Sequence, residues 1–120
     1  MNHKPRTTPE KLQLRAATAA DIEVILSFIR ELADYERLAH LVEADTDMLR
    51  DTLFGEARYA EVVIAEYDAE PAGFALFFHN YSTFMARPGL YLEDLYVKPA
   101  FRGAGIGGRL LSHLGELAVQ

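Results

Sequence analysis

The sequence predicts one α/β (α+β) domain, a mainly antiparallel sheet flanked by helices in the order β-α-α-β-β-β-α. Two observations lead to this fold class. Alternating or β-branched apolar segments are interleaved with segments of helical periodicity, and two of the apolar segments are separated only by a short turn. The chain has 120 residues, half of them apolar, which suits one hydrophobic core and would be cramped for two.

The first strand is expected from Leu12, where "LQLRAAT" alternates apolar and polar residues. A helix should follow at once, because Thr18 can cap it while Asp21, three residues later, can satisfy free amides and favour the helix dipole. This helix should reach about Tyr35. Its buried face is predicted by apolar residues at three- and four-residue spacing, namely Ile22, Ile25, Leu26, Phe28, Ile29 and Leu32.

A second, shorter helix is expected to start with Asp45 or Thr46 as its cap. It should end near Phe54, where Gly55 can take the left-handed C-terminal position.

Three strands and a last helix fill the rest of the chain. "AEVVIAEY" (60–67) and "AGFALFFHNYS" (72–82) should form a hairpin around the turn "DAEP" (68–71). A loop through Arg87, Pro88 and Gly89 then leads to the strand "LYLEDLYV" (90–97). "KPAFRGAG" (98–105) leads to the last helix, "IGGRLLSHLGELAVQ".

Composition narrows the function classes. There is no cysteine, so neither disulfides nor thiolate metal sites are available. The net charge of −6, without a Lys/Arg cluster, argues against nucleic acid and fits a neutral or cationic small partner. No apolar run reaches the ~20 residues of a membrane span, and residues 1–11 lack a signal-peptide core. We expect a soluble, cytoplasmic protein with a flexible N-terminal tail and a domain over 12–120.

The glycine-rich segment near the C-terminus matches two nucleotide motifs only superficially. Gly103, Gly105 and Gly108 satisfy G-x-G-x-x-G, but five residues separate them from the strand, and no acidic residue follows at the required distance. A phosphate loop of the G-x-x-x-x-G-K-[ST] type fails because Arg109 and Leu110 replace the Lys and Ser/Thr.

The same segment nevertheless has the chemistry of an anion site. Small residues let backbone amides approach a ligand, the following helix start is positive, and Arg102 adds a fixed charge suited to phosphate oxygens. The alternative is a glycine-rich helix start without a ligand. Gly107 and Gly108 favour the anion site, because each costs the helix about 1 kcal/mol relative to alanine.

"RGAGIG" (102–107), preceded by a strand and by "V-x-P-x-x-R" (97–102), resembles the R/Q-x-x-G-x-G/A motif of the GNAT superfamily of acyl-CoA-dependent N-acetyltransferases. The resemblance implies acetyl-CoA as co-substrate and no metal. It implies that the backbone of Leu95, Tyr96 and Val97 contacts the pantetheine arm. The pyrophosphate would bind the amides of the loop that Arg102 opens, which comprises Gly103, Ala104, Gly105, Ile106, Gly107 and Gly108.

From Leu12 onward the chain also resembles the diamine (spermidine/spermine) acetyltransferase branch, in "IRELADYERL", "FG", "GFALFF" and "LYLEDLYV". The resemblance implies that Glu93 is the catalytic base and that Tyr35, Glu36 and Glu93 line the amine site. Ser82 is also expected in the amine site, since it stands where the branch places a polyamine-binding aspartate, and its different chemistry leaves a smaller amine as a further possibility. The alternative for Tyr35 is that it ends the core face of its helix.

A base is chemically necessary for N-acetyl transfer. An alkylamine with a pKa near 10.4 is almost wholly protonated at neutral pH, and only the neutral amine is a nucleophile. Strict alternation along the strand would place Glu93 with Tyr91 and Leu95, and Asp94 with Leu92 and Tyr96. We expect burial beside the substrate to raise the pKa of Glu93 and expect Asp94 to pair with an arginine or cap a loop. Direct attack on the thioester needs no covalent enzyme intermediate.

Four histidines, His3, His40, His79 and His113, show no metal-ligand spacing. Family members continue beyond the position of Gln120 with a strand that closes the cofactor cleft and a helix carrying a tyrosine acid. The chain is therefore expected to be incomplete at its C-terminus, or else to use an exposed strand edge for pairing, and the family resemblance implies a homodimer. The alternative function is a non-catalytic acyl-CoA-binding or regulatory module, or a half-domain that needs a partner chain.

Overall fold

The computed structural model describes residues 11–119, in which four strands form one antiparallel sheet of order β1-β2-β3-β4. The predicted N-terminal tail, except Lys11, and His3 with it, lies outside the described residues. The strands are β1 (Leu12–Ala16), β2 (Glu61–Tyr67), β3 (Glu70–Ser82) and β4 (Arg87–Val97). The helices are α1 (Ile22–Tyr35), α2 (Thr46–Phe54) and α3 (Ile106–Ala118), with 3₁₀ turns at Ala19–Asp21, Ala39–Leu41 and Pro99–Phe101. This order confirms the predicted fold class.

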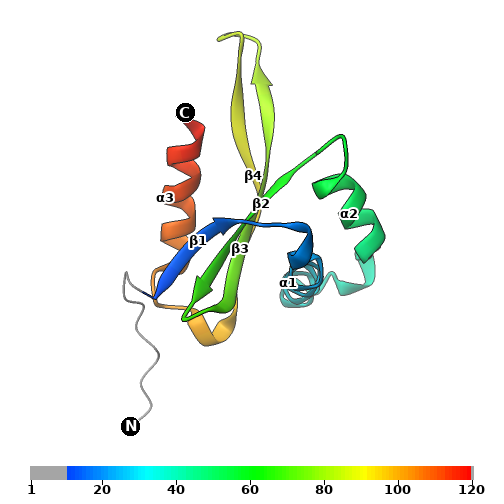
Figure 1. Ribbon diagram of the computed structural model, residues 1–120, viewed down its shortest axis with the longest axis vertical. Helices are drawn as coiled ribbons and strands as arrows, with labels where there is room; N and C mark the ends of the chain where they lie inside the picture. The colour runs from blue at the N-terminus through cyan, green and yellow to red at the C-terminus, as the bar shows by residue number, and fades with distance from the viewer. Residues whose placement is uncertain (1–10, 120) are drawn as a thin grey trace.

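The sheet lies between two helical layers, with α3 on one face and α1 and α2 on the other (Figure 1). Strand β2 is buried on both faces: Val63 and Ala65 point to the α3 side, whereas Val62 and Ile64 point to the α1 side. A strand covered on both faces is expected to be an apolar run rather than an alternating one, which is how "VVIA" reads.

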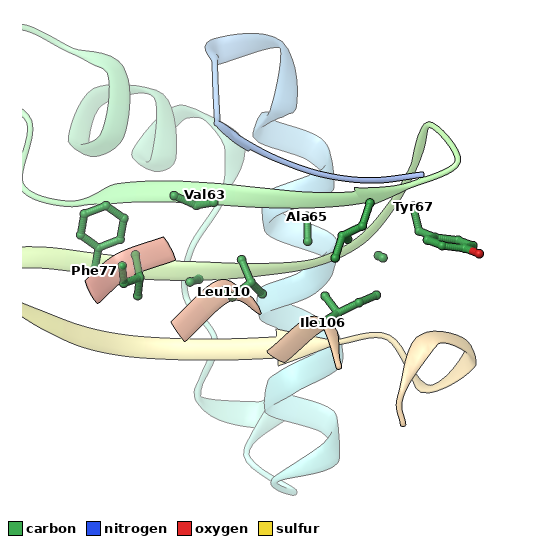
Figure 2. Packing of buried hydrophobic residues seen from close by; sticks show 10 residues of the cluster. Val63, Ala65, Tyr67, Phe77, Ile106 and Leu110 are labelled. Atoms are coloured by element: carbon green, nitrogen blue, oxygen red, sulfur yellow. The ribbon is translucent and has the colours of Figure 1, made fainter. Parts of the chain in front are cut away.

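The α3 layer depends on one stripe of side chains. Ile106, Leu110 and Leu114 recur every four residues and are 1%, 0% and 4% exposed. Figure 2 shows Ile106 and Leu110 among the side chains of β2 and β3. Because Ile106 is the first residue of α3, its burial fixes the end of the glycine-rich loop against the sheet.

The α1 layer is built around aromatic rings that pack together. The rings of Phe28 and Phe74 lie 5.4 Å apart, and that of Tyr96 lies 5.9 Å from Phe28. Phe28 is in α1, Phe74 in β3 and Tyr96 in β4, so the cluster joins these three elements. The C-terminal end of β4, just before the glycine loop, is thereby held against α1.

The entry to α1 follows the predicted capping pattern. The amide of Thr18 donates to the Asp21 carboxylate at 2.8 Å, although the first turn is 3₁₀ and the α-helix starts only at Ile22. Arg15 of β1 donates twice to the same carboxylate, at 2.7 and 2.8 Å, and also to Glu66 of β2 at 3.1 Å. The helix start is therefore tied to two strands.

Two local predictions are wrong. Gly55 ends α2 with φ −79° and ψ −168°, which is extended rather than left-handed, while Asp45 does cap the helix by accepting from the Met48 amide at 2.8 Å. Residues Arg87, Pro88 and Gly89 belong to β4 instead of a loop, because they pair with Ser82, Tyr81 and Asn80 of β3. The β3–β4 hairpin is consequently long and projects beyond the helices (Figure 1).

The predicted alternation of β4 is also wrong, and the cause is a β-bulge. Asp94 pairs with Leu76 and Leu92 with Phe77, so Glu93 is an extra residue with no partner on β3. As a result Leu92 and Leu95 both pack on the α3 side, while Tyr96 packs on the α1 side. Asp94 does not share a face with Leu92.

Within residues 11–119 no helix combines the length and the apolar character that a bilayer crossing requires.

Candidate functional site

The glycine-rich loop connects β4 to α3 and has a conformation that requires glycine at two positions. Gly103 and Gly105 have φ of 84° and 83°, values that residues with a side chain rarely adopt. Gly105 is the N-cap of α3, and no side chain caps this helix in the described part of the chain. The first amides of α3 lack acceptors within the helix, so its N-terminus suits an anion.

The loop is held at both ends. The amide of Lys98 donates to Ala72 O of β3 at 2.8 Å, and that of Phe101 donates to Lys98 O at 2.9 Å. The ring of Phe101 meets Tyr67 edge-on at 5.9 Å between centroids. Together with the burial of Ile106, these contacts keep the loop beside the end of β4.

The two helical glycines leave open space over the first turn of α3. A Cβ placed on Gly108 would have no neighbour within 4 Å, and one on Gly107 would only touch Leu95 and Val97 at 3.9 Å. Packing inside the protein therefore does not require glycine here. The first turn of α3 is therefore open to a ligand, and the free amides at its N-terminus suit an anion.

Three carboxylates come together where β4 bulges near the end of α1. Glu36 follows the last residue of α1, Glu93 is the bulged residue, and Asp94 is next to it. Glu36 and Glu93 are exposed and Asp94 is half-buried. Burial, and then the negative charges of Glu93 and Glu36, raise the pKa of Asp94 above its usual value.

The perturbed acid is therefore Asp94, where the sequence pointed to Glu93. The expected arginine partner of Asp94 is absent within residues 11–119, where Arg15, Arg50 and His79 supply the cationic groups of the ion pairs. Sequence reasoning missed the shift because burial is its largest cause, and the burial of Asp94 depends on the packing around β4, which a sequence period of two does not show.

A second cluster links the glycine loop to α1. Tyr35, 70% exposed at the end of α1, lies with its ring 4.9 Å from the Arg102 guanidinium carbon, and the ring of Tyr96 lies 5.5 Å from it. Arg102 Nε also donates to Val97 O at 2.9 Å. Tyr35 thus does not contribute to the core face of its helix, and it contacts the motif arginine.

Glu31 completes this cluster, and sequence reasoning did not single it out. The hydroxyl of buried Tyr96 donates to Glu31 Oε1 at 2.9 Å. Burial, with the hydrogen bond to Glu31 and its charge, raises the pKa of Tyr96. Glu31 precedes Tyr35 by four residues on the same helix face, and this spacing could have indicated it.

Ser82 lies apart from both clusters. It is the last residue of β3, pairs with Arg87, and accepts from the Met85 amide at 3.3 Å in the hairpin turn. Phe77, opposite the bulge, is five residues away along the strand, roughly 16 Å at 3.3 Å per residue. The structure does not bring Ser82 to the carboxylates.

His79 makes its contacts away from these clusters. His79 Nε2 lies 2.9 Å from Glu61 Oε2 on the exposed surface of the sheet. Among residues 11–119 no three His, Cys, Asp or Glu side chains are grouped in a way that could hold a metal ion.

The sequence profile of the acetyltransferase (GNAT) family matches residues 25–120, which include both clusters and the glycine loop. The chain belongs to the GNAT acetyltransferase family. This membership confirms the resemblance found in the sequence and the expected enzyme class, an acyltransferase. GNAT acetyltransferases use acetyl-CoA as co-substrate.

Named relatives cover most of this GNAT chain. Thialysine N-epsilon-acetyltransferase of Bos taurus is 37% identical over 117 residues, which is 91% of this chain and 68% of the relative. Spermidine/spermine N(1)-acetyltransferase-like protein 1 of Homo sapiens is 34% identical over 122 residues, which is 95% of this chain and 17% of the relative. The GNAT chain thus spans about two thirds of the bovine protein.

Solved structures agree with the fold. An aminoglycoside acetyltransferase from an uncultured soil metagenomic sample, in complex with sisomicin, matches with a TM-score of 0.76 at 17% identity, covering 92% of this chain and 71% of that one. An integron cassette protein of V. cholerae matches with a TM-score of 0.71 at 23% identity, covering 91% and 68%. At such identities the likeness concerns the architecture alone.

Proposed function

We propose that this GNAT domain transfers an acetyl group from acetyl-CoA to the amine of a small cationic substrate. The observation that carries the proposal is the meeting of Glu36, Glu93 and Asp94 near the end of α1, on the strand that leads into the glycine loop. A negative cluster attracts a cationic amine, and the loop offers amides to an anionic cofactor.

On the cofactor side, the loop from Arg102 to Gly108 would hold the pyrophosphate through its backbone, and the backbone of Leu95, Tyr96 and Val97 would contact the pantetheine arm. Acetyl-CoA supplies the acetyl group as a thioester. Support comes from the left-handed Gly103 and Gly105 and from the open space over Gly108.

On the amine side, a carboxylate must take the proton that an alkylammonium carries at neutral pH. Glu93 is the proposed base, and its exposure on the bulge makes it accessible to a substrate or a bridging water. Asp94 adds its charge to those of Glu36 and Glu93, and its raised pKa would make it a stronger base than an ordinary aspartate. The absence of cysteine agrees with direct attack by the amine.

The proposed substrate is a small aliphatic amine. Relatives at 34–38% identity are named for thialysine and for spermidine/spermine, and an Arabidopsis thaliana relative at 26% is named for L-ornithine. All of these carry a primary amine on a flexible, mainly aliphatic chain. Tyr35 and Glu36 are proposed to line this site, and Ser82 is not expected to contact the substrate directly.

We also expect a homodimer, which sedimentation equilibrium would test.

The test is an acetylation assay with acetyl-CoA across thialysine, lysine, ornithine, spermidine and an aminoglycoside. Glu93→Gln should lower kcat/KM about 10²–10⁴-fold, as expected for loss of a general base. Asp94→Asn tests the neighbouring acid, and Asp51→Asn on the exposed face of α2 is the control. Undiminished turnover in Glu93→Gln would remove the base assignment, and coenzyme A binding without turnover on any amine would favour a non-catalytic acyl-CoA-binding module.

A further inference from the structure

The side chain of Arg102 lies on the α1 side of the sheet. Its guanidinium carbon is 4.9 Å from the ring centroid of Tyr35 and 5.5 Å from that of Tyr96, which packs in the α1 core cluster. Helix α3, whose N-terminus carries the glycine loop, packs on the opposite face. The charge of Arg102 therefore packs with the α1 layer, whereas the side chains of the helix that begins at Ile106 pack on the other face of the sheet.

The contacts of Arg102 join three elements. Its Nε donates to Val97 O at the end of β4, its face lies against Tyr35 at the end of α1, and its backbone begins the glycine loop. Through Tyr96 the same group reaches Glu31, because the Tyr96 hydroxyl donates to that carboxylate at 2.9 Å. A planar guanidinium suits this place, because it can stack on aromatic rings while one N–H donates in its plane.

We propose that Arg102 is a positioning residue whose side chain clips the cofactor loop and the end of β4 to the amine-side end of α1, and is not a charge that binds the cofactor phosphates. The inference rests on the proposed function, since it links the two proposed substrate sites. It assigns Arg102 two roles: its backbone opens the phosphate loop, and its side chain fixes the Val97 carbonyl and the Tyr35 ring.

Arg102→Lys keeps the charge but removes the Nε donor and the planar face, and Arg102→Gln removes the charge but keeps a planar donor. With acetyl-CoA and the best amine of the assay above, we expect Arg102→Lys to lower kcat/KM for the amine about tenfold. The Kd of coenzyme A should change less than about twofold in calorimetry. Arg50→Lys, at an exposed arginine of α2, is the matched control and should leave both unchanged.

A thioester without phosphates separates positioning from phosphate binding. If Arg102 positions β4 and Tyr35, Arg102→Gln lowers kcat/KM by the same factor with acetyl-CoA and with acetyl-pantetheine. If its charge binds phosphate, the loss is confined to acetyl-CoA and grows weaker with added salt, and the inference is overturned.

Tyr35→Leu provides a second route to the same question. Tyr35 is mostly exposed, so the variant should fold, and it removes the ring from the guanidinium. Because the two residues act through one contact, the double variant Tyr35→Leu/Arg102→Lys should lose no more activity than the worse single variant. Losses that multiply would show that the two residues act independently and would overturn the inference.

An NMR measurement tests the contacts of Arg102 directly, without depending on whether an amine is acetylated. In the wild-type chain the Arg102 Nε–H should exchange slowly with water and shift upfield beneath the two rings, and Tyr35→Leu should reduce the shift. A rapidly exchanging, unshifted Nε–H would show that the Arg102 side chain does not make these contacts, and would overturn the inference whatever the activity. A shifted Nε–H with no amine acetylated defeats the proposed function but leaves the contact established.

Discussion

Asp21 and Asp94 are both removed in part from water, yet their surroundings shift their pKa values in opposite directions. The Arg15 guanidinium, hydrogen-bonded to Asp21, outweighs the effect of burial and holds the pKa of that carboxyl below its usual range. Within residues 11–119 no cation offsets the burial of Asp94, and the charges of Glu93 and Glu36 raise its pKa further. A lowered carboxyl pKa means that the charged form stabilises the fold, whereas a raised pKa beside other acids is typical of a functional site.

The lowered pKa of Asp21 predicts that the free energy of unfolding decreases as the pH falls. A depressed folded-state pKa contributes stability above the unfolded pKa of about 3.9, and this contribution is lost as pH falls through the folded value. Asp21→Asn should therefore lower the free energy of unfolding by about 1–2 kcal/mol at pH 7. The difference from wild type should shrink below pH 4 in urea titrations. Asp34→Asn, at an exposed position of α1, is the control, and an equal effect there would contradict the prediction.

For Asp94 the sign is reversed. A raised folded-state pKa means that stability is greatest below the unfolded pKa and is lost as pH rises through the folded value. Asp94→Asn should be more stable than wild type at pH 7, and the two should converge in acid below pH 3.8. The variant should at the same time lose activity toward amines. A variant less stable than wild type at neutral pH would show that the carboxylate has a structural partner.

At the scale of elements, α3 combines a well-packed stripe with an N-terminal turn that has no side-chain cap. Ile106, Leu110 and Leu114 hold one face to the sheet, while Gly107 and Gly108 leave the first turn bare. Strand β4 combines regular pairing with the bulge at Glu93, followed by a close approach to β3. A Cβ on Gly73 would lie 2.4 Å from Tyr96 O, so only glycine lets β3 approach β4 this closely. Both elements depart from regularity where the proposed site lies.

Substituting two glycines of α3 by alanine, one at a time, distinguishes an effect on ligand binding from an effect on helix stability. A Cβ would find open space at both Gly108 and Gly115, so alanine at either position should stabilise the helix by up to about 1 kcal/mol. If the first turn receives the cofactor, Gly108→Ala should weaken coenzyme A binding about tenfold or more, while Gly115→Ala should leave the Kd unchanged. Equal Kd values in calorimetry would exclude Gly108 from the site.

At the scale of the whole molecule, β2 connects two core clusters that share no helix. The α3 cluster and the α1–α2 cluster both contain buried residues of β2 and β3, so neither layer can separate without exposing the central strands. Because the α3 layer and the α1 layer lie on opposite faces of β4, the proposed cofactor loop and the proposed amine site can both lie near the C-terminal part of this one strand. The proposed Arg102 clip acts across this division.

The shared sheet predicts a single cooperative transition. Leu110→Ala on the α3 side and Ile25→Ala on the α1 side, both 0% exposed, should each lower the free energy of unfolding by about 2–5 kcal/mol. Far-ultraviolet circular dichroism and tyrosine fluorescence should give coincident urea curves for both variants. Curves that separate in one variant would mean that the layers unfold independently.

The sequence by itself determined the order of elements, the core stripes of α1 and α3, the N-terminal capping of the first two helices and the glycine loop, and its motif identified the family. These features depend on residues close in sequence, whose periodicity and turn chemistry act locally. Only the tertiary structure decided that Glu93 bulges out of register, that the charge of Glu36 acts on Asp94, and that Arg102 lies against Tyr35. Those relations depend on strand pairing and helix packing between residues far apart in the chain, which no local pattern encodes.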